Sequence, residues 1–156
     1  MSDSLKILVA QLNPIVGDID GNLEMARKTL KEGASRGADL VVFAEMFLLG
    51  YPPEDLVLKP SAVDDCMHAA RELARESGDL PAFVIGSPWA EEGALYNSAI
   101  YCAGGEIEAR YDKQELPNYG VFDEQRLFDK GRSPAVIFEL KGVKIGLAIC
   151  EDVWFE

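Results

Sequence analysis

The chain has 156 residues, of which 48% are hydrophobic and 27% are charged, a composition typical of a soluble globular domain with one core. Its 27 acidic residues outnumber its 15 basic residues, and the resulting net charge of −12 opposes binding to nucleic acid or to anionic lipid. No apolar run approaches the ~20 residues that span a bilayer, and the first residues lack the basic flank of a signal peptide. We therefore expect a cytoplasmic protein with neither a membrane nor a nucleic-acid partner.

Three apolar runs in the first half of the chain predict strands. They are LKILVAQL (5–12), ADLVVFAE (38–45) and PAFVIGSP (81–88). The first is apolar enough to be a strand that is buried on both faces of a sheet, and the second is expected to be a buried strand as well.

Two segments with helical spacing of apolar residues lie between these strands. The segment 19–37 is expected to begin at the helix cap Asp20 and to end at Gly37. The segment 61–78 carries an apolar stripe that includes Cys66. The loop 46–60 is too rich in glycine and proline to be regular.

The second half of the chain is expected to form two β-hairpins. Their turns are Gly104-Gly105 and Lys141-Gly142. The flanking strands are predicted at 94–103, 106–113, 135–140 and 143–150, with an irregular loop at 112–134. The order β-α-β-α-β followed by hairpins predicts an α/β fold with a parallel or mixed sheet and helices packed outside it.

Cys150 is the last residue of the apolar run KIGLAIC, and two interpretations of this cysteine are open. A cysteine in this setting is a small buried hydrophobe or a nucleophile, and a nucleophile needs a base and a donor for the oxyanion. The only histidine, His68, lies opposite the apolar stripe of its helix, so it is a poor candidate for the base. Without a second histidine or a CxxC pair, neither a zinc site nor a disulfide framework is indicated, and Cys66 and Cys102 are expected to be structural thiols.

A carboxylate and an amine remain as partners for a reactive Cys150. Glu45 closes the strand 38–45, and Lys113 ends the strand 106–113. Taken alone, Glu45 is better explained as a solvated strand end and Lys113 as a surface lysine. Strand ends are nevertheless where open α/β sheets carry their sites.

Three segments resemble the signature segments of the nitrilase superfamily. They are FAEMFLLGYPPEDLVLKP, YDKQELPNYGVFDEQRLF and IGLAICEDVW, in this order. More narrowly, GYPPEDLVLKP and KQELPNYGVFDEQRLF are similar to the glutaminase domain of the glutamine-dependent NAD+ synthetases. The resemblance implies an α-β-β-α sandwich of two mixed sheets with outer helices.

The resemblance also implies a role for each site residue. Glu45 would be the general base, Lys113 would stabilise the oxyanion together with the backbone N–H of Glu151, and Cys150 would attack the side-chain amide of glutamine. Tyr119 matches a residue that contacts glutamine, and Glu124 is a second carboxylate that holds Lys113 in the same substrate site. Asp55 and Arg126 are expected to serve loop structure or domain contacts.

On this resemblance, residues 1–156 are expected to be the incomplete N-terminal part of a carbon-nitrogen hydrolase domain. The rest of the domain and a synthetase domain that amidates deamido-NAD+ would be absent. No cofactor is then expected in this chain, because ATP and Mg²⁺ would belong to the absent domain. Glutamine is the expected substrate and a homo-oligomer the expected assembly, with weak or no activity for the isolated chain.

Two alternatives remain open. The first is another nitrilase-type amidase that acts on a small amide or an N-carbamoyl compound. The second is a non-catalytic fragment that serves as an oligomerisation module.

Overall fold

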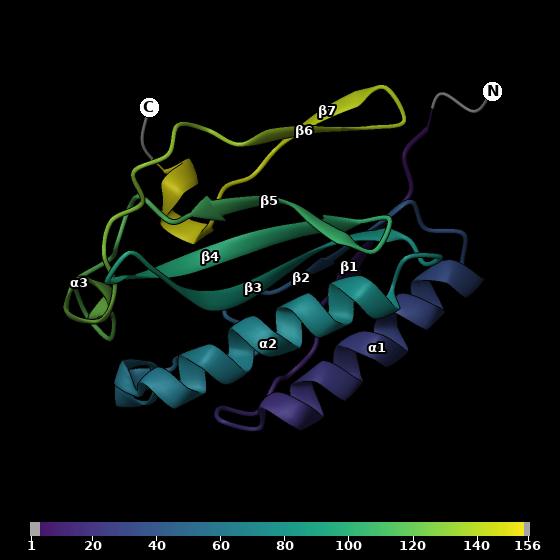
Figure 1. Ribbon diagram of the computed structural model, residues 1–156. Coiled ribbons are helices and arrows are strands. Elements are labelled where there is room, and N and C mark those ends of the chain that lie inside the picture. Colours follow the sequence, from purple (N-terminus) through teal and green to yellow (C-terminus); the bar gives the residue numbers. More distant parts are fainter. Residues whose placement is uncertain (1–3, 155–156) are drawn as a thin grey trace.

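The computed structural model describes residues 4–154, which form three layers (Figure 1). The middle layer is a five-stranded sheet of order β1-β2-β3-β4-β5, made of Ile7–Ala10, Leu40–Phe43, Ala82–Glu91, Ala94–Ala103 and Glu106–Asp112. One outer layer consists of the helices α1 (Ile19–Ser35) and α2 (Pro60–Glu76), and the other of the antiparallel pair β6 (Ile137–Leu140) and β7 (Val143–Gly146). The shorter helical elements are α3 (Glu124–Leu127) and the 3₁₀ helices Glu54–Leu58 and Cys150–Val153.

The large sheet is mixed. β1, β2 and β3 are parallel, whereas β3, β4 and β5 are antiparallel neighbours. Parallel neighbours need a crossover connection, and α1 and α2 supply the two crossovers on the same face of the sheet (Figure 1). The α/β class and the mixed sheet predicted from the sequence are thus confirmed.

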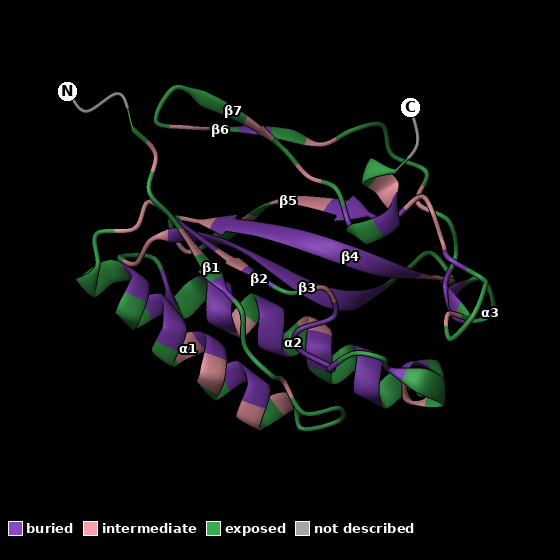
Figure 2. Cartoon of the chain, turned by 180° about the vertical axis from the view of Figure 1, so that it is seen from behind, coloured by how far each residue is buried: buried purple, intermediate pink, exposed green. Residues whose placement is uncertain are grey.

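Two apolar clusters hold the three layers together. Between the helices and the sheet, the buried side of each helix faces the strands (Figure 2), and the rings of Phe43 and Phe47 lie 4.9 Å apart. On the opposite face, Tyr101 of β4 stacks on Phe138 of β6, with ring centroids 3.6 Å apart. This contact joins the β6–β7 layer to the large sheet. No helix in the described part of the chain is long and apolar enough to cross a membrane.

The first strand differs from its prediction. β1 is an edge strand, and Ile7 and Val9 are 51% and 72% exposed, so the expectation that it is buried on both faces is wrong. An apolar run reports the hydrophobicity of a strand but carries no information about how many neighbours the strand has.

Helix and turn boundaries also differ in detail. The cap of α1 is Asp18, whose Oδ1 accepts a hydrogen bond from the N–H of Gly21 at 3.1 Å, so the assignment of the cap to Asp20 is wrong. The segment 46–60, expected to be irregular, contains the 3₁₀ helix Glu54–Leu58.

The turn after β2 lies directly against β3, and Gly86 makes this approach possible. A Cβ atom on Gly86 would lie 2.4 Å from the N of Met46 and 2.5 Å from the O of Ala44. The N–H of Leu48 donates to the O of Gly86 at 3.1 Å, which fixes the turn to the strand. Since Glu45 lies inside this turn, the missing side chain at Gly86 sets the position of Glu45.

Substitution of Gly86 by alanine tests this packing. We expect Gly86→Ala to lower the free energy of unfolding by about 1–3 kcal/mol, because a well-packed site must shift to accept a methyl group. The measurement is urea unfolding followed by circular dichroism. The control is Gly146→Ala in β7, where an added Cβ meets no atom within 4 Å, and equal stability losses in the two variants would contradict the prediction.

Candidate functional site

The ends of two strands bring Glu45 and Lys113 to one edge of the fold. Glu45 lies two residues after β2, and Lys113 directly follows β5. β4 runs against β3, and β5 runs against β4, so β5 has the same direction as β2 and β3. The carboxyl ends of β2 and β5 therefore meet at the same edge.

Lys113 is fully buried and forms the centre of the site. Its Nζ donates to Glu45 Oε1 at 2.7 Å and to both carboxylate oxygens of Glu124, at 3.0 and 2.8 Å. Burial lowers the pKa of Lys113, but the hydrogen bonds to Glu124 and Glu45 outweigh burial, and the pKa is raised above its ordinary value. The lysine therefore stays charged in a place closed to solvent.

Asn97 of β4 connects Lys113 to Glu45. Its Nδ2 donates to Glu45 Oε1 at 2.7 Å, and its backbone O accepts the N–H of Lys113 at 2.8 Å. Sequence reasoning missed this residue. The signal was a polar residue inside the otherwise apolar run ALYNSAIYCA, since a buried amide needs partners.

Glu124 has a second donor besides Lys113. The hydroxyl of Tyr51 donates to Glu124 Oε1 at 3.2 Å, a contact that the sequence analysis did not foresee. Burial raises the pKa of Glu124, and Lys113 and Tyr51 act in the opposite direction. The structure thus places Glu124 in contact with Lys113, as expected from the sequence.

Cys150 does not end a strand, contrary to the predicted strand 143–150. β7 stops at Gly146, and Cys150 is the first residue of a 3₁₀ turn, with a left-handed φ of 50°. A non-glycine residue in this region carries a conformational cost of about 1–3 kcal/mol, and such residues cluster at functional sites. The turn leaves the thiol exposed.

The thiol of Cys150 is protonated at rest. Although the residue is exposed overall, the atoms packed around its sulfur partly desolvate it and raise its pKa, and the negative charge of Glu45 adds to this effect. Lys113 and the backbone N–H of Glu151 lower the pKa, but the net direction is upward. A nucleophilic Cys150 would therefore need a base rather than a resident thiolate.

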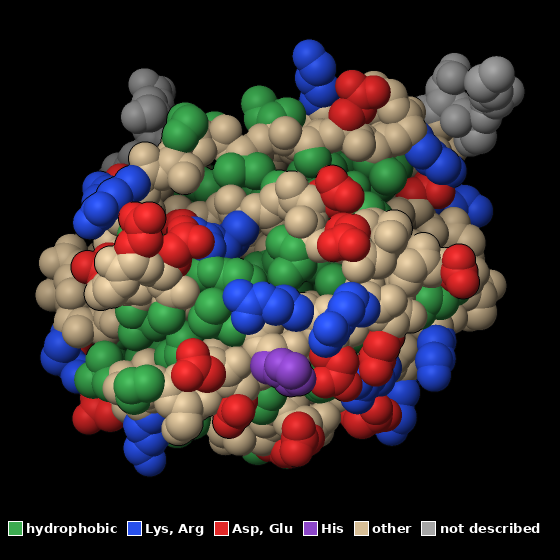
Figure 3. Space-filling model, viewed as in Figure 1, with side chains coloured by type: hydrophobic (Ala, Val, Ile, Leu, Met, Phe, Trp, Pro, Cys, Tyr) green, Lys and Arg blue, Asp and Glu red, His purple; other side chains and the backbone are tan. Residues whose placement is uncertain are grey.

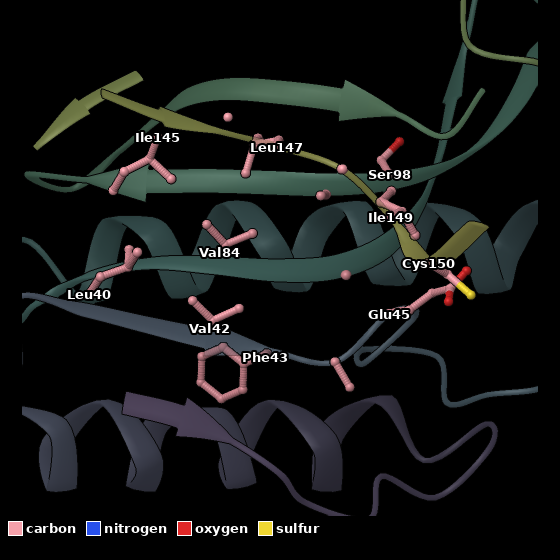
Figure 4. A pocket seen from close by; sticks show the side chains of 15 residues that line it. Leu40, Val42, Phe43, Glu45, Val84, Ser98, Ile145, Leu147, Ile149 and Cys150 are labelled. Carbon is pink, nitrogen blue, oxygen red and sulfur yellow. The ribbon is translucent and has the colours of Figure 1, made fainter. Parts of the chain in front are cut away.

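An apolar cavity of about 240 Å³ extends from Cys150 between the two sheets. Figure 4 shows the side chains of Glu45 and Cys150 together at one end of it, with Leu40 and Ile145 at the other. On the face in Figure 3, hydrophobic side chains form a band between the β6–β7 layer and the helices. The acid and the thiol thus meet where an apolar space reaches the edge of the fold.

Glu151 and Tyr119 lie beside Cys150. Glu151 is buried, and its Oε2 has no hydrogen-bond partner within residues 4–154. Tyr119 is half exposed, and its hydroxyl contacts Glu151. Oε2 of Glu151, beside the thiol, therefore accepts no hydrogen bond from the described residues.

The remaining residues singled out in the sequence lie elsewhere. His68 is exposed on α2, 3.8 Å from Glu72, and Cys66 and Cys102 are buried in the core. Asp55 and Arg126 form an ion pair of 2.8 Å that joins the 3₁₀ helix Glu54–Leu58 to α3. Within residues 4–154, no group of three or more His, Cys, Asp or Glu side chains is arranged to hold a metal ion.

The family model for the carbon-nitrogen hydrolases matches residues 6–156. The chain is 44% identical over 154 residues to a glutamine-dependent NAD+ synthetase of Rhodobacter capsulatus and 41% identical over 150 residues to one of Thermotoga maritima. These matches cover 99% and 96% of this chain, but only 28% and 26% of the two relatives. The chain thus spans little more than a quarter of their length.

Solved structures of similar proteins agree with these sequence matches. The glutamine-dependent NAD+ synthetase of Acinetobacter baumannii superposes with a TM-score of 0.90 at 38% identity, over 96% of this chain and 28% of that protein. An amidase of Nesterenkonia sp. AN1 superposes with a TM-score of 0.83 at 26% identity, over 97% of this chain and 57% of that protein. That structure is of a mutant of the amidase, in which the acetamide moiety of fluoroacetamide is added covalently to the active-site cysteine.

The raised pKa of Cys150 predicts its reactivity. Because the thiolate is the reacting form, a raised pKa leaves less thiolate at each pH and displaces the rate profile to higher pH. We expect the rate of iodoacetamide alkylation of Cys150 to keep rising above the pH at which an unfolded cysteine peptide levels off, as measured by mass spectrometry. Cys66 and Cys102, whose burial raises both pKa values to about 12, should stay unlabelled. A profile at or below that of the peptide would refute the prediction.

Removal of the charge on Lys113 should destabilise the fold. Lys113→Met leaves Glu45 and Glu124 facing each other without a cation, and the expected loss is about 3–5 kcal/mol in urea unfolding. Lys113→Met combined with Glu124→Gln should recover part of this loss. The control is Lys130→Met, an exposed lysine paired with Glu115, for which a change within about 0.5 kcal/mol is expected. A loss no larger for Lys113→Met than for this control would contradict the proposed buried ion cluster.

Proposed function

This chain belongs to the carbon-nitrogen hydrolase family, and from that premise we propose that its site hydrolyses the side-chain amide of glutamine. The observation that carries the proposal is the buried Lys113, held at 2.7 Å by Glu45 in a site where both charges act on the thiol of Cys150. An acid, a cation and a thiol without histidine are suited to amide cleavage by proton transfer and oxyanion stabilisation.

The proton transfer assigned to Glu45 follows from its hydrogen bonds. Lys113 and Asn97 both donate to Oε1, each at 2.7 Å. Within the described residues, Oε2 accepts no hydrogen bond and is free to take the thiol proton. The two donors thus orient the carboxylate without occupying the oxygen that acts as the base.

In the first half of the reaction, Glu45 takes the proton of Cys150 while the sulfur attacks the amide carbon. The carbonyl oxygen becomes an oxyanion, which the N–H of Glu151 stabilises by a hydrogen bond and the positive charge of Lys113 stabilises by electrostatic attraction. Glu45 then returns the proton to the amide nitrogen, the C–N bond breaks and ammonia leaves. A thioester of glutamate with Cys150 remains.

In the second half, water replaces ammonia. Glu45 takes a proton from the water, and the oxygen of that water attacks the thioester carbon. The oxyanion that forms is stabilised by the same groups as in the first half. The C–S bond breaks, the sulfur regains the proton from Glu45, and glutamate leaves. No cofactor takes part in either half. Tyr119, beside Glu151, is proposed to contact the substrate outside the reacting bond.

The use of the ammonia is a proposal for the intact protein. The relatives matched over nearly all of this chain are named glutamine-dependent NAD+ synthetases. We therefore propose that residues 1–156 form the N-terminal part of a glutaminase domain. Its ammonia would be used to amidate deamido-NAD+ to NAD+, with ATP and Mg²⁺ acting outside this segment.

A second candidate is the hydrolysis of small aliphatic amides. It is favoured by the likeness to the Nesterenkonia amidase, whose active-site cysteine carries an acetamide group. The identity of 26% to that amidase, compared with 41% and 44% to the synthetases of Thermotoga maritima and Rhodobacter capsulatus, supports glutamine as the substrate. The comparison of kcat/KM for glutamine and for propionamide separates the two.

The proposal is tested by ammonia release from glutamine in the intact protein. We expect Cys150→Ala to abolish release and Glu45→Gln to lower kcat by about 10²–10⁴-fold, the usual range for loss of a general base. The control is Glu115→Gln, a half-exposed glutamate paired with Lys130, which should keep the activity. Glutamine hydrolysis that persists in Cys150→Ala would overturn the proposal.

A further inference from the structure

The half-buried carboxylate of Asp152 accepts hydrogen bonds from two separate segments of the site. Its Oδ1 accepts the N–H groups of Gln114 and Glu115, at 3.0 and 2.8 Å. Its Oδ2 accepts the N–H of Ile149 at 2.9 Å. The hydroxyl of Tyr111 also contacts this carboxylate and has its pKa raised, first by burial and then by Asp152.

These partners flank the proposed catalytic residues. Gln114 and Glu115 directly follow Lys113, and Ile149 directly precedes Cys150. Asp152 itself lies two residues after Cys150, in the same 3₁₀ turn. A single carboxylate therefore joins the backbone that carries the lysine to the backbone that carries the thiol, although 37 residues separate Glu115 from Asp152.

The chemistry of the carboxylate suits this role. An ionised carboxylate only accepts hydrogen bonds, and bonds from N–H groups to a charged acceptor are about twice as strong as neutral ones. An amide at this position has one acceptor oxygen, and its NH₂ group would face an N–H. The Asp152→Asn variant would therefore keep the bonds to Gln114 and Glu115 or the bond to Ile149, but not both.

We propose that Asp152 is a positioning residue that sets the distance between Lys113 and Cys150 by fixing their two backbone segments to each other. It touches neither the reacting atoms nor the lysine side chain. The bond to Ile149 also closes the turn that holds Cys150 in its left-handed conformation. A role limited to that turn would leave the two bonds to the Lys113 segment without a function.

The experiment compares Asp152→Asn, Asp152→Glu and a control in the intact protein. The control is Asp39→Asn, because Asp39 precedes β2 at the opposite end from Glu45 and its carboxylate likewise accepts a backbone N–H, that of Lys6 at 2.9 Å. Steady-state kinetics are measured with glutamine and with propionamide. Labelling of each cysteine by iodoacetamide reports on the fold, because Cys66 and Cys102 are buried.

We expect Asp152→Asn to lower kcat by about 10²-fold with KM changed less than about threefold, as for a small displacement of a catalytic group. Cys150 should remain open to iodoacetamide and the two buried cysteines protected. Asp152→Glu, which keeps both oxygens, should recover part of kcat, and Asp39→Asn should leave kcat unchanged.

The inference rests on the proposed roles of Lys113 and Cys150, and the outcomes separate the two. An unchanged kcat in Asp152→Asn overturns the positioning role and leaves the proposed function standing. A loss of kcat accompanied by labelling of Cys66 and Cys102 shows a general role in folding and also overturns it. Turnover of propionamide without glutamine overturns the proposed substrate, and the positioning role is then decided on propionamide. A wild-type protein that turns over neither overturns both.

Discussion

The structure of the site depends on one constraint, that the ammonium group of Lys113 has no access to water. A charge in such a place must be surrounded by acceptors, and Glu45 and Glu124 supply them from the end of β2 and from α3. Because Lys113 itself follows β5, its three hydrogen bonds fix three distant parts of the chain to one point. The edge of the sheet, α3 and the turn after β2, which packs on Gly86, are arranged about this cation.

The same cation has two opposed effects on the chemistry. Its charge favours a thiolate at Cys150, but the two carboxylates that keep it buried act in the opposite direction. Together with burial, the carboxylates prevail, and the thiol keeps its proton. The site is therefore arranged for transfer of that proton to a nearby base as the sulfur attacks, and Lys113 is reserved for the charge that forms on the substrate oxygen.

Much of this arrangement was readable from the sequence, since it lay in local patterns. The Gly104-Gly105 turn, the apolar stripe of α2 and the mixed sheet follow from residue types and spacing, and the structure confirms them. Glu45, Lys113 and Cys150 were singled out at the ends of predicted strands, and the resemblance to the nitrilase superfamily linked them. The structure places Glu45 in contact with Lys113 and beside Cys150. Their catalytic roles remain predictions.

The features that the sequence analysis missed depend on contacts across the fold. β1 is an edge strand because only β2 pairs with it among the described strands. The residues of β1 do not indicate how many neighbours it has. Asn97 and Asp152 look like ordinary polar residues until their partners are brought beside them. These partners are the carboxylate of Glu45 for Asn97 and three backbone N–H groups for Asp152. The 3₁₀ turn at Cys150 was missed for the same reason. The apolar run continues to Cys150, but β7 ends at Gly146, and the run itself does not mark that point.

The protonated state of Cys150 has a consequence for survival in an oxidising environment. Peroxides attack thiolates and leave thiols largely alone, and the first product, a sulfenic acid, leads on to species that no longer act as nucleophiles. Cys66 and Cys102 are shielded by the core, so Cys150 is the cysteine most open to such damage in the described chain. Partial burial and the surrounding carboxylates raise the pKa of this thiol, and the smaller fraction of thiolate that results slows its oxidation as well as its alkylation.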